Sequence, residues 1–555
     1  MGHHRRSKRV TRVNRRGDCL MLSRFRRVAG AVSAVTMLTI SPNTAPASAA
    51  AIESPNLLVN PGAEFGDPSL SGYSSVSIPG WTVTGTPTVI KYGTVRRLPW
   101  PLGSPGPTLP AALGFPRSQN GPPDGAVQFF GGGNVATATL TQTVDLSGVR
   151  EIASGTVPYR LSGWLGGFLE DPSEASVTVT FWDANQSPLG TGKIGPVTVL
   201  DRGLRTALLE RETTGTIPVG TRSARVVVTL KDRNPVIGNY NNAYADNVSF
   251  TVGLPLPAPP PPTPPPSKVG PLDHVFMIYL ENHGVKDIVG SSNAPYINGL
   301  INNNGYGSNY FAQTHPSLPN YYPILGGSDF GFNYNCELDC FDEPNLADNI
   351  ERAGKGWASY EQSMPSPCFT QSSGPYSPGE LPFLAFHDIV SNTARCQAHV
   401  LPLQRMATDL ASTSTTPNYA WFAADEDHNM EGPINIEFIL SLLTNHQYNI
   451  KAGDKFLADT LPTILDSPAF LTQRTAIFIT WDEDYDNLSL GIGNEGNHVP
   501  MIVIASPNSG MRQGHLVAGN YNNHYSLLRT IEDALGLPRL TNNDRFAQPM
   551  NDYWP

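Results

Sequence analysis

The feature that most constrains this chain is a proline-rich stretch near its middle. Residues 254–271 read LPLPAPPPPTPPPSKVGP. Proline fixes φ and has no N–H to donate, so this stretch cannot form a helix or join a β-ladder. We expect an extended polyproline conformation of about 3.1 Å per residue. The stretch is therefore predicted to be a stiff spacer between two domains, at residues 51–253 and 272–555.

The beginning of the chain has the features of a secretory signal peptide. Arg24, Arg26 and Arg27 precede the apolar run 28–40, and small residues at 47–51 would suit a signal peptidase. The apolar run is shorter than the roughly 20 residues that a membrane helix needs, and we find no longer run after it. We therefore predict a signal peptide at residues 1–50, a secreted mature protein and no integral membrane segment.

The cysteines favour disulfide bonds. Cys19 lies in the predicted signal peptide, and an even number remains in the exported part, namely Cys336, Cys340, Cys368 and Cys396. Four cysteines in an oxidising compartment allow three pairings, and proximity favours Cys336 with Cys340 and Cys368 with Cys396. A zinc site is the alternative, although the spacings do not form paired C-x-x-C knuckles.

The first domain shows the alternation typical of an antiparallel β-sandwich. Apolar and polar residues alternate in ATATLTQTVDL at 136–146, SVTVTF at 176–181 and ARVVVTL at 224–230, with turn residues between such runs. Short alternating strands of this kind pack as two facing sheets. The fold class predicted for this domain is therefore an antiparallel sandwich.

Three further segments of this domain, NLLVNPGAE at 56–64, GWLGGF at 163–168 and YADNVSF at 244–250, resemble a galactose-binding-like jelly roll. The resemblance implies a concave face that could bind glycan. It also implies that Glu64, Asp246 and Asn247 could hold a structural calcium ion, although turn and capping roles explain these residues equally well.

After the spacer, apolar runs alternate with amphipathic stretches. Runs of this kind are typical of strands buried on both faces, and they predict a layered α/β domain with a mostly parallel sheet. The predicted strands are 274–280, 419–423, 475–481 and 500–505, and the predicted helices include 346–353, 455–465 and 525–535.

The charge of the chain argues against a nucleic-acid partner. It has 47 acidic and 37 basic residues, a net charge of -10, and many of the basic residues lie in the predicted signal peptide. An acidic body repels the phosphates of a polymer. A small phosphate ester bound at a metal stays compatible with this charge.

Polar side chains follow the predicted strands at the points where reactive groups gather in α/β sheets. They are Glu281 and Asn282, then Asp425, Asp427 and His428, then Asp482 and Glu483, while His498 stands just before the last strand. Each one alone could be a helix cap or an ordinary hydrogen-bonded group. Carboxylates gathered together raise each other's pKa unless a cation neutralises them, so their recurrence predicts a divalent metal site. Oxygen ligands favour Ca²⁺, Mg²⁺ or Mn²⁺ over zinc.

The segment THPSLPNYYPILGG at 314–327 contains a candidate nucleophile, Ser317. Pro316 and Pro319 restrict the backbone around it. We expect Ser317 at a helix start, where backbone N–H groups would favour a phosphate oxygen. Thr314 is the second candidate, and a plain turn is the alternative.

Several of these motifs together resemble a known family. YLENHG, THPSLPNYYPILGG, ITWDED, GNHVP and NNHYSLLRTIEDALGLP look like the phosphoesterase family of secreted acid phosphatases and phosphocholine-type phospholipases C, within the alkaline phosphatase superfamily. The similarity spans residues 272–540 and implies an alkaline phosphatase-like fold. It also implies roles for individual residues: metal binding by Glu281, Asn282, Asp482 and Glu483, transient phosphorylation of Ser317, and phosphoryl binding by Asn320.

One region departs from the family pattern. Members read approximately N-D-x-H-D where this chain reads DEDHNME at 425–431. Asp427 and His428 are our candidates for leaving-group protonation or a second cation, and Asp425 is a further metal candidate. His498 is an alternative proton donor.

Together these features predict a secreted, metal-dependent phosphomonoesterase of the acid phosphatase type, acting through a phosphoserine. One alternative is a phospholipase C-like diesterase that binds a phospholipid headgroup, with choline in an aromatic cage of Trp357, Tyr360, Tyr419 and Trp421. Another is a glycan- or surface-binding protein without catalytic activity.

Overall fold

The computed structural model describes residues 53–97, 105–124, 126–233, 240–433, 435–442, 444–484 and 496–555. Contacts between Cα atoms group the described residues into one compact unit. The predicted signal peptide and Cys19 lie outside the described residues. Secretion therefore stays a prediction at this point.

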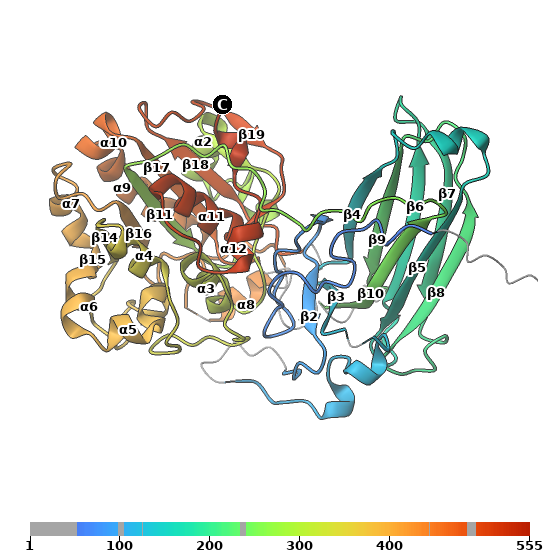
Figure 1. Cartoon of the computed structure of the whole chain (residues 1–555). Coiled ribbons are helices and arrows are strands. Elements are labelled where there is room, and N and C mark those ends of the chain that lie inside the picture. Colours follow the sequence, from blue (N-terminus) through green and yellow to red (C-terminus); the bar gives the residue numbers. More distant parts are fainter. Residues whose placement is uncertain are drawn as a thin grey trace, which may run out of the picture. The chain divides into compact units, whose positions relative to one another are not determined.

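Residues 82–252 form two antiparallel five-stranded sheets, which confirms the predicted sandwich (Figure 1). Alternate side chains point between the sheets, as in β6, where every second residue is buried. One sheet has the order β1 (Thr82–Thr84), β4 (Thr137–Asp145), β9 (Ser223–Lys231), β6 (Glu174–Trp182) and β7 (Pro188–Val197). The other has the order β2 (Thr88–Lys91), β3 (Gln128–Gly133), β10 (Asn241–Val252), β5 (Pro158–Gly167) and β8 (Ala207–Thr216). Glycan binding by this domain stays a prediction.

Residues 254–271 form neither helix nor strand, as their proline content predicts. The end of this spacer is tied to the α/β domain, because Ser267 Oγ donates a hydrogen bond to Asp533 Oδ2 at 2.7 Å. The backbone N–H of Lys268 donates to Asn551 Oδ1, also at 2.7 Å.

The second domain is built on an eight-stranded, mostly parallel sheet, as predicted. Strands β11, β14, β15, β16 and β17 are mutually parallel, whereas β18 runs antiparallel to both of its neighbours. The order is β15 (Val400–Pro402), β14 (Trp357–Glu361), β16 (Tyr419–Ala423), β11 (His274–Leu280), β17 (Thr475–Trp481), β18 (Met501–Ala505), β12 (Gly305–Gly307) and β19 (Leu516–Ala518). A separate pair consists of β13 (Tyr310–Phe311) and β20 (Asn522–Asn523).

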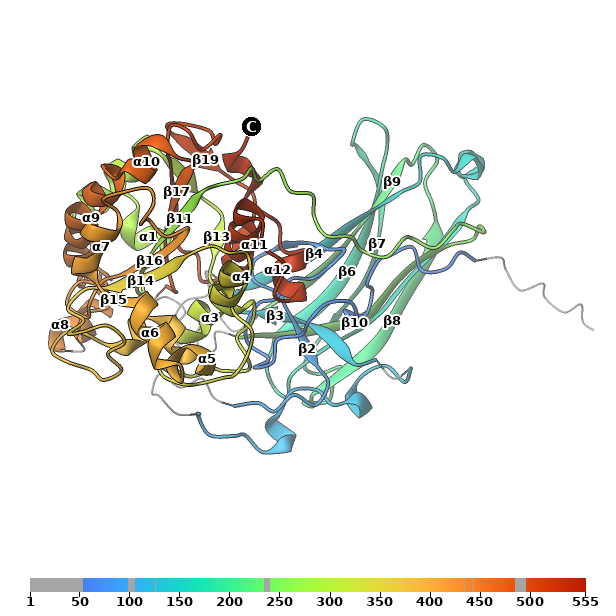
Figure 2. The same cartoon turned by 60° about the vertical axis from the view of Figure 1, so that its left-hand side comes forward.

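Helices cover both faces of this sheet, with α9 on one face and α11 on the other (Figures 1 and 2). The helix α11 packs against β11 and against α3, the helix that follows Ser317. The longer helices are α2 (Pro295–Asn303), α3 (Leu318–Gly326), α4 (Leu346–Arg352), α6 (Thr393–His399), α8 (Ile436–Leu442), α9 (Ile450–Leu465) and α11 (His524–Leu535). The short ones include α1 (Val285–Ile288), α5 (His387–Val390), α7 (Met406–Asp409), α10 (Pro468–Thr472) and α12 (Asn542–Phe546).

The sequence predicted the long buried strands well. The runs 274–280, 419–423 and 475–481 are strands with those same bounds. We did not predict β14, because its sequence WASYE is short and mixes polar with aromatic residues. It is nevertheless buried along its whole length, since it pairs with β15 and β16 on either side.

No helix among the described residues is long and apolar enough to cross a membrane.

The four cysteines form the two predicted disulfides, Cys336–Cys340 and Cys368–Cys396. The zinc alternative for these residues is therefore wrong.

The two disulfides should contribute unequally to stability. Cys368 and Cys396 are 28 residues apart, whereas Cys336 and Cys340 are 4 apart. A longer closed loop removes more entropy from the unfolded chain, so we expect losses of about 3–4 kcal/mol for Cys368→Ala/Cys396→Ala and about 2 kcal/mol for Cys336→Ala/Cys340→Ala. Urea unfolding of the two variants measures this difference, and a larger loss from the short loop would contradict it.

Candidate active site

The predicted carboxylates meet at one edge of the parallel sheet. Strands β11 and β17 end in register, with Leu280 opposite Trp481, so Glu281 and Asp482 follow side by side. Strand β16 is the other neighbour of β11, and Asp425 follows it. Adjacent strands lie about 4.8 Å apart, so these three residues follow strands that end along the same edge of the sheet.

Ser317 lies at this edge, at the start of α3. Its Oγ donates a hydrogen bond to Glu281 Oε2 at 3.1 Å. Glu281 also accepts a hydrogen bond from the hydroxyl of Tyr321, one turn further along α3, and one from Asn282 Nδ2 at 3.2 Å. A candidate nucleophile and a candidate proton acceptor are therefore in direct contact.

Asp482 is held by the backbone beside this pair. Its Oδ1 accepts from the backbone N–H groups of Asn282 and Glu483, each at 2.6 Å. Asn282 has a φ of 59°, a left-handed conformation that turns the chain sharply after β11. These contacts join the ends of β11 and β17.

Burial raises the pKa of Glu281, Asp482 and Glu483. The pKa of Asp482 is raised to about 7, first by burial and then by the charge of Glu483. Burial, followed by the charges of Asp482 and Glu380, raises the pKa of Glu281 well above its ordinary value. The pKa of Glu483 is raised by burial and by Asp484. The group cannot carry its full negative charge without a positive partner.

The residues present fit a hard divalent cation. Asp482 Oδ2 is buried and has no hydrogen-bond partner among the described residues. The surrounding donors are carboxylate and amide oxygens, which Ca²⁺, Mg²⁺ and Mn²⁺ prefer. In the described part of the chain, no three His, Cys, Asp or Glu side chains are already arranged to hold an ion. The metal site therefore stays a prediction.

Two glutamates that the sequence did not single out belong to the same acidic cluster. Glu380, on the short 3-10 helix Pro378–Glu380, and Glu431 both have a raised pKa, caused first by burial and then by neighbouring carboxylates that include Asp482. The pKa of Glu431 is about 8. Neither follows a strand directly, so the strand-end rule could not find them.

His315 is a further residue that the sequence analysis missed. Its Nδ1 lies 2.5 Å from Glu483 Oε2, and it is fully buried two residues before Ser317. Burial lowers the pKa of His315 to about 4, so the imidazole is neutral at pH 7. Its position in the THPS motif, two residues before the candidate nucleophile, could have pointed to it in the sequence.

Asn320 holds the loop that leads to Ser317. Its Oδ1 accepts from the backbone N–H groups of Gln313 and Thr314 at 3.0 and 2.9 Å. Its Nδ2 donates to the carbonyls of Thr314 and Pro316 at 2.9 and 3.3 Å. The amide is thus occupied by the loop, and phosphoryl binding by Asn320 stays a prediction without a contact that supports it.

The start of α3 differs from our expectation in one respect. The N–H of Leu318 donates to Asn335 Oδ1, Pro319 has no N–H, and the N–H of Asn320 donates to the carbonyl of Ser317. The expectation that these groups are available to a phosphate oxygen is therefore wrong, because the protein already uses them.

The remaining predicted residues, Asp425, Asp427, His428 and His498, have different surroundings. His428 Nδ1 lies 2.6 Å from Asp425 Oδ1, and Ser363 donates to the other oxygen of Asp425, also at 2.6 Å. Asp427, by contrast, is exposed. His498 bonds through Nε2 to the carbonyl of Ser308 at 2.9 Å and stacks on Phe311. The Asp425–His428 pair has the geometry of an imidazole oriented by a carboxylate, and none of these catalytic roles is tested.

The proposed aromatic cage for choline is not formed. Its four residues are buried in the core of the α/β domain, with exposed fractions of 2% for Trp357 and 0% for Tyr360, Tyr419 and Trp421. Trp421 packs against Tyr279 instead. This correction removes the feature that favoured the phosphocholine diesterase.

The similarity of the α/β domain to known proteins agrees with this geometry. Residues 290–538 match the model described as the Phosphoesterase family. This match covers most of the α/β domain and less than half of the whole chain. The match includes Ser317, Asp482 and Glu483, while Glu281 and Asn282 lie just before it. The domain is a hydrolase of phosphoric esters.

Three curated relatives are named phosphatases. A phosphatidylinositol-3-phosphatase of Mycobacterium tuberculosis is 27% identical over 51% of this chain and 82% of its own length. An acid phosphatase of Aspergillus fumigatus is 24% identical over 48% of this chain and 55% of its own, and a probable acid phosphatase of Kluyveromyces lactis is 26% identical over 48% and 59%. This chain thus spans little more than half of the fungal relatives.

Among solved structures, a protein in the alkaline phosphatase superfamily from Vibrio parahaemolyticus has a TM-score of 0.35 and 10% identity, covering 51% of this chain and 70% of its own. A likeness of this size adds nothing to the argument.

Proposed function

We propose that the protein is a secreted, metal-dependent phosphomonoesterase that acts through a phosphoserine at Ser317. The observation that carries this proposal is the hydrogen bond from Ser317 Oγ to buried Glu281, beside Asp482 and Glu483. A serine hydroxyl needs such an acceptor or a cation to become a nucleophile.

The first chemical step uses these contacts. Ser317 transfers its proton to Glu281 as its Oγ attacks phosphorus in line with the leaving group. Glu281 Oε2 already accepts the hydrogen bond from Ser317 Oγ, so the proton can pass to it without a rearrangement of either side chain. A divalent cation, held by Glu281, Asn282, Asp482 and Glu483, would supply charge neutralisation and lower the pKa of the serine hydroxyl.

The second step regenerates the serine. The ester oxygen leaves with a proton, for which His428, oriented by Asp425, is our candidate donor. Water then attacks the phosphoserine and gives a proton back to His428, while the phosphorus–Oγ bond breaks to release phosphate. The proton returns to Ser317 from Glu281.

The surroundings of the site and the names of the relatives support a monoester as the substrate class. A phosphomonoester needs no choline cage, and the aromatic residues considered for one are buried in the core. The mycobacterial relative is named for a monoester of an inositol lipid, and the fungal relatives are named acid phosphatases. Secretion is supported by the signal-like N-terminus and by the two disulfides.

Parallel assays test this function. Purified protein with Ca²⁺, Mg²⁺ or Mn²⁺ is expected to hydrolyse p-nitrophenyl phosphate with a kcat/KM at least about 10-fold above that for p-nitrophenyl phosphorylcholine, a difference of about 1.4 kcal/mol in transition-state binding. A chelator should remove the activity, and adding the cation back should restore it. Faster cleavage of the phosphorylcholine ester would favour the diesterase, and no cleavage of either ester with any cation would contradict the proposal.

A further inference from the structure

One segment of the sandwich domain contacts the chain on both sides of the nucleophile helix α3. We call residues 65–77 the docking segment; it precedes β1 and is largely buried between Ser69 and Val76. At the start of α3, the backbone N–H of Ser75 donates to the carbonyl of Gln313 at 3.0 Å. Gln313 is also held by Asn320, so the loop that carries Ser317 is fixed by α3 and by the sandwich.

The second contact lies just beyond the end of α3. Ser71 Oγ donates to Asp329 Oδ2 at 2.7 Å, and Ser74 Oγ donates to the same oxygen. Asp329 is buried, with 2% of its surface exposed, and its other oxygen accepts from the N–H of Gly331 at 2.9 Å. The two serine hydroxyls thus stabilise a buried carboxylate that anchors the chain after α3.

A third contact runs through α12. Thr541 Oγ1 and Asn543 Nδ2 donate to the carbonyl of Gly327, the residue that ends α3, at 2.9 and 3.2 Å. The docking segment in turn holds α12, because Ser77 Oγ donates to the carbonyl of Asn543 at 2.6 Å and Asp67 accepts from Asn542. All three contacts act on the chain just before or just after the same helix.

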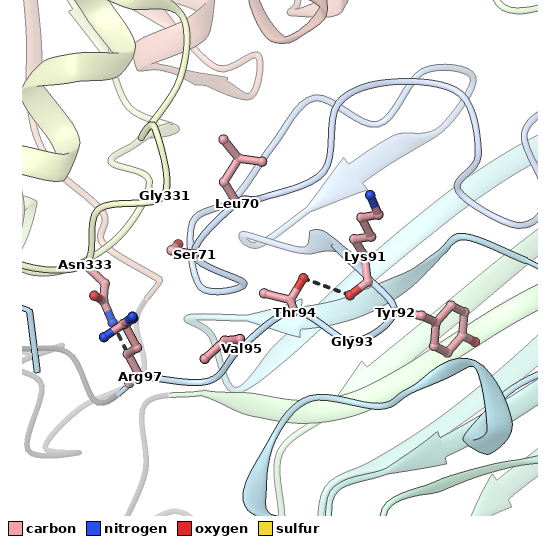
Figure 3. A pocket seen from close by; sticks show the side chains of 10 residues that line it. All are labelled: Leu70, Ser71, Lys91, Tyr92, Gly93, Thr94, Val95, Arg97, Gly331 and Asn333. Carbon is pink, nitrogen blue, oxygen red and sulfur yellow. Dashed lines mark hydrogen bonds between the residues drawn. The ribbon is translucent and has the colours of Figure 1, made fainter. Parts of the chain in front are cut away.

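Open space borders part of the chain after α3. A cavity of about 450 Å³ opens beside Ser71 and is bordered by Gly331 and Asn333 of the α/β domain and by Leu70 and Arg97 of the sandwich domain (Figure 3). None of the predicted catalytic or metal-binding residues lines it. Beside this space, Asn333 Nδ2 donates to the carbonyl of Arg97 at 3.2 Å, and the hydrogen bond from Ser71 to Asp329 is shorter, at 2.7 Å.

We propose that the docking segment is a positioning element of the active site, through which the sandwich domain holds Ser317 in line for attack. Ser71 and Ser74 are its positioning residues, acting on Ser317 through Asp329 and α3. The inference rests on the proposed role of Ser317. A displacement of about 1 Å in a reacting group can lower a rate by about 10²-fold, so a modest shift of α3 is sufficient to be measured.

The test is the variant Ser71→Ala/Ser74→Ala in the full chain. We expect kcat for p-nitrophenyl phosphate to fall about 10-fold, equivalent to about 1.4 kcal/mol, with KM changed less than about 2-fold. The rate of Ser317 phosphorylation in a single turnover should fall by the same factor. Ser71→Thr keeps the hydroxyl and can place its methyl group in the cavity, so it should retain activity.

A matched control removes two hydroxyls elsewhere in the sandwich. Thr84 and Thr139 share a hydrogen bond at 2.6 Å on exposed β1 and β4, and Thr84→Ala/Thr139→Ala should leave kcat unchanged. Wild-type kcat in Ser71→Ala/Ser74→Ala, while Ser317→Ala is inactive, would overturn the positioning role alone. Activity in Ser317→Ala would overturn the proposed function instead. If the double serine variant does not fold, the single variant Ser71→Ala decides the question: a fall in kcat supports the role and an unchanged kcat overturns it.

Discussion

Replacing Ser317 by alanine is expected to lower kcat for p-nitrophenyl phosphate at least about 10³-fold, because removal of a covalent nucleophile leaves only binding and electrostatic stabilisation. Glu281 keeps its hydrogen bonds from Tyr321 and Asn282 in this variant, so the fold should be retained. Steady-state kinetics with saturating cation measure the loss. Acid-quenched protein should carry a labile phosphoryl group in the wild type and none in Ser317→Ala.

A matched control is Ser414→Ala, which removes an exposed serine hydroxyl of the same domain. It should leave kcat and the phosphoenzyme unchanged. Thr314→Val tests the second candidate nucleophile, whose hydroxyl donates to the adjacent His315 carbonyl. If Ser317→Ala kept more than a tenth of the wild-type kcat, an attacking serine would be excluded.

Removal of divalent cations should make stability fall as the pH rises. The folded pKa values of Asp482 and Glu431 are about 7 and about 8, above their ordinary values of 3.8 and 4.5. Between about pH 4 and pH 8 the folded protein therefore binds more protons than the unfolded chain, and stability is lost as the pH rises through this window. At about 1.4 kcal/mol per pKa unit, the shift of Asp482 alone corresponds to about 4 kcal/mol.

Cations should reverse this trend, because they bind the deprotonated carboxylates. We expect Ca²⁺, Mg²⁺ or Mn²⁺ to raise the melting temperature by several degrees at pH 8 and by much less at pH 5. His315 and His524, whose pKa values are lowered to about 4 and about 3, have the opposite effect: their contribution to stability increases as the pH rises to about 6.5. These histidines are fewer than the carboxyl groups of the cluster. Melting curves in chelator and in cation, from pH 5 to pH 8, measure both effects.

The variant Asp482→Asn provides the control for this experiment. Without the carboxylate, the cation-free protein should lose less stability between pH 5 and pH 8, and the stabilisation by cation at pH 8 should shrink. Equal cation responses at both pH values in the wild type would show that the acidic cluster does not bind the ion.

The sequence alone determined the parts of this protein that depend on local pattern. Composition and periodicity predicted the proline spacer, the alternating strands of the sandwich and the buried strands β11, β16 and β17. They do so because they decide which backbone conformation can form its hydrogen bonds and bury its apolar side chains. The strand-end rule also found Glu281, Asp425 and Asp482, since parallel strands finish at one edge of a sheet. Short spacing was sufficient to favour the observed disulfide pairing.

Only the tertiary structure decided which distant side chains meet. Glu380 and Glu431 reach the cluster from a 3-10 helix and a loop, and no spacing in the sequence encodes that approach. The N–H group of Leu318, the first residue of α3, is occupied because it donates to Asn335, a residue that follows α3 in the chain. The contact of the docking segment with Asp329 joins residues more than 250 positions apart. Such contacts arise from packing over long sequence separations, whereas a linear pattern reports only on neighbours along the chain.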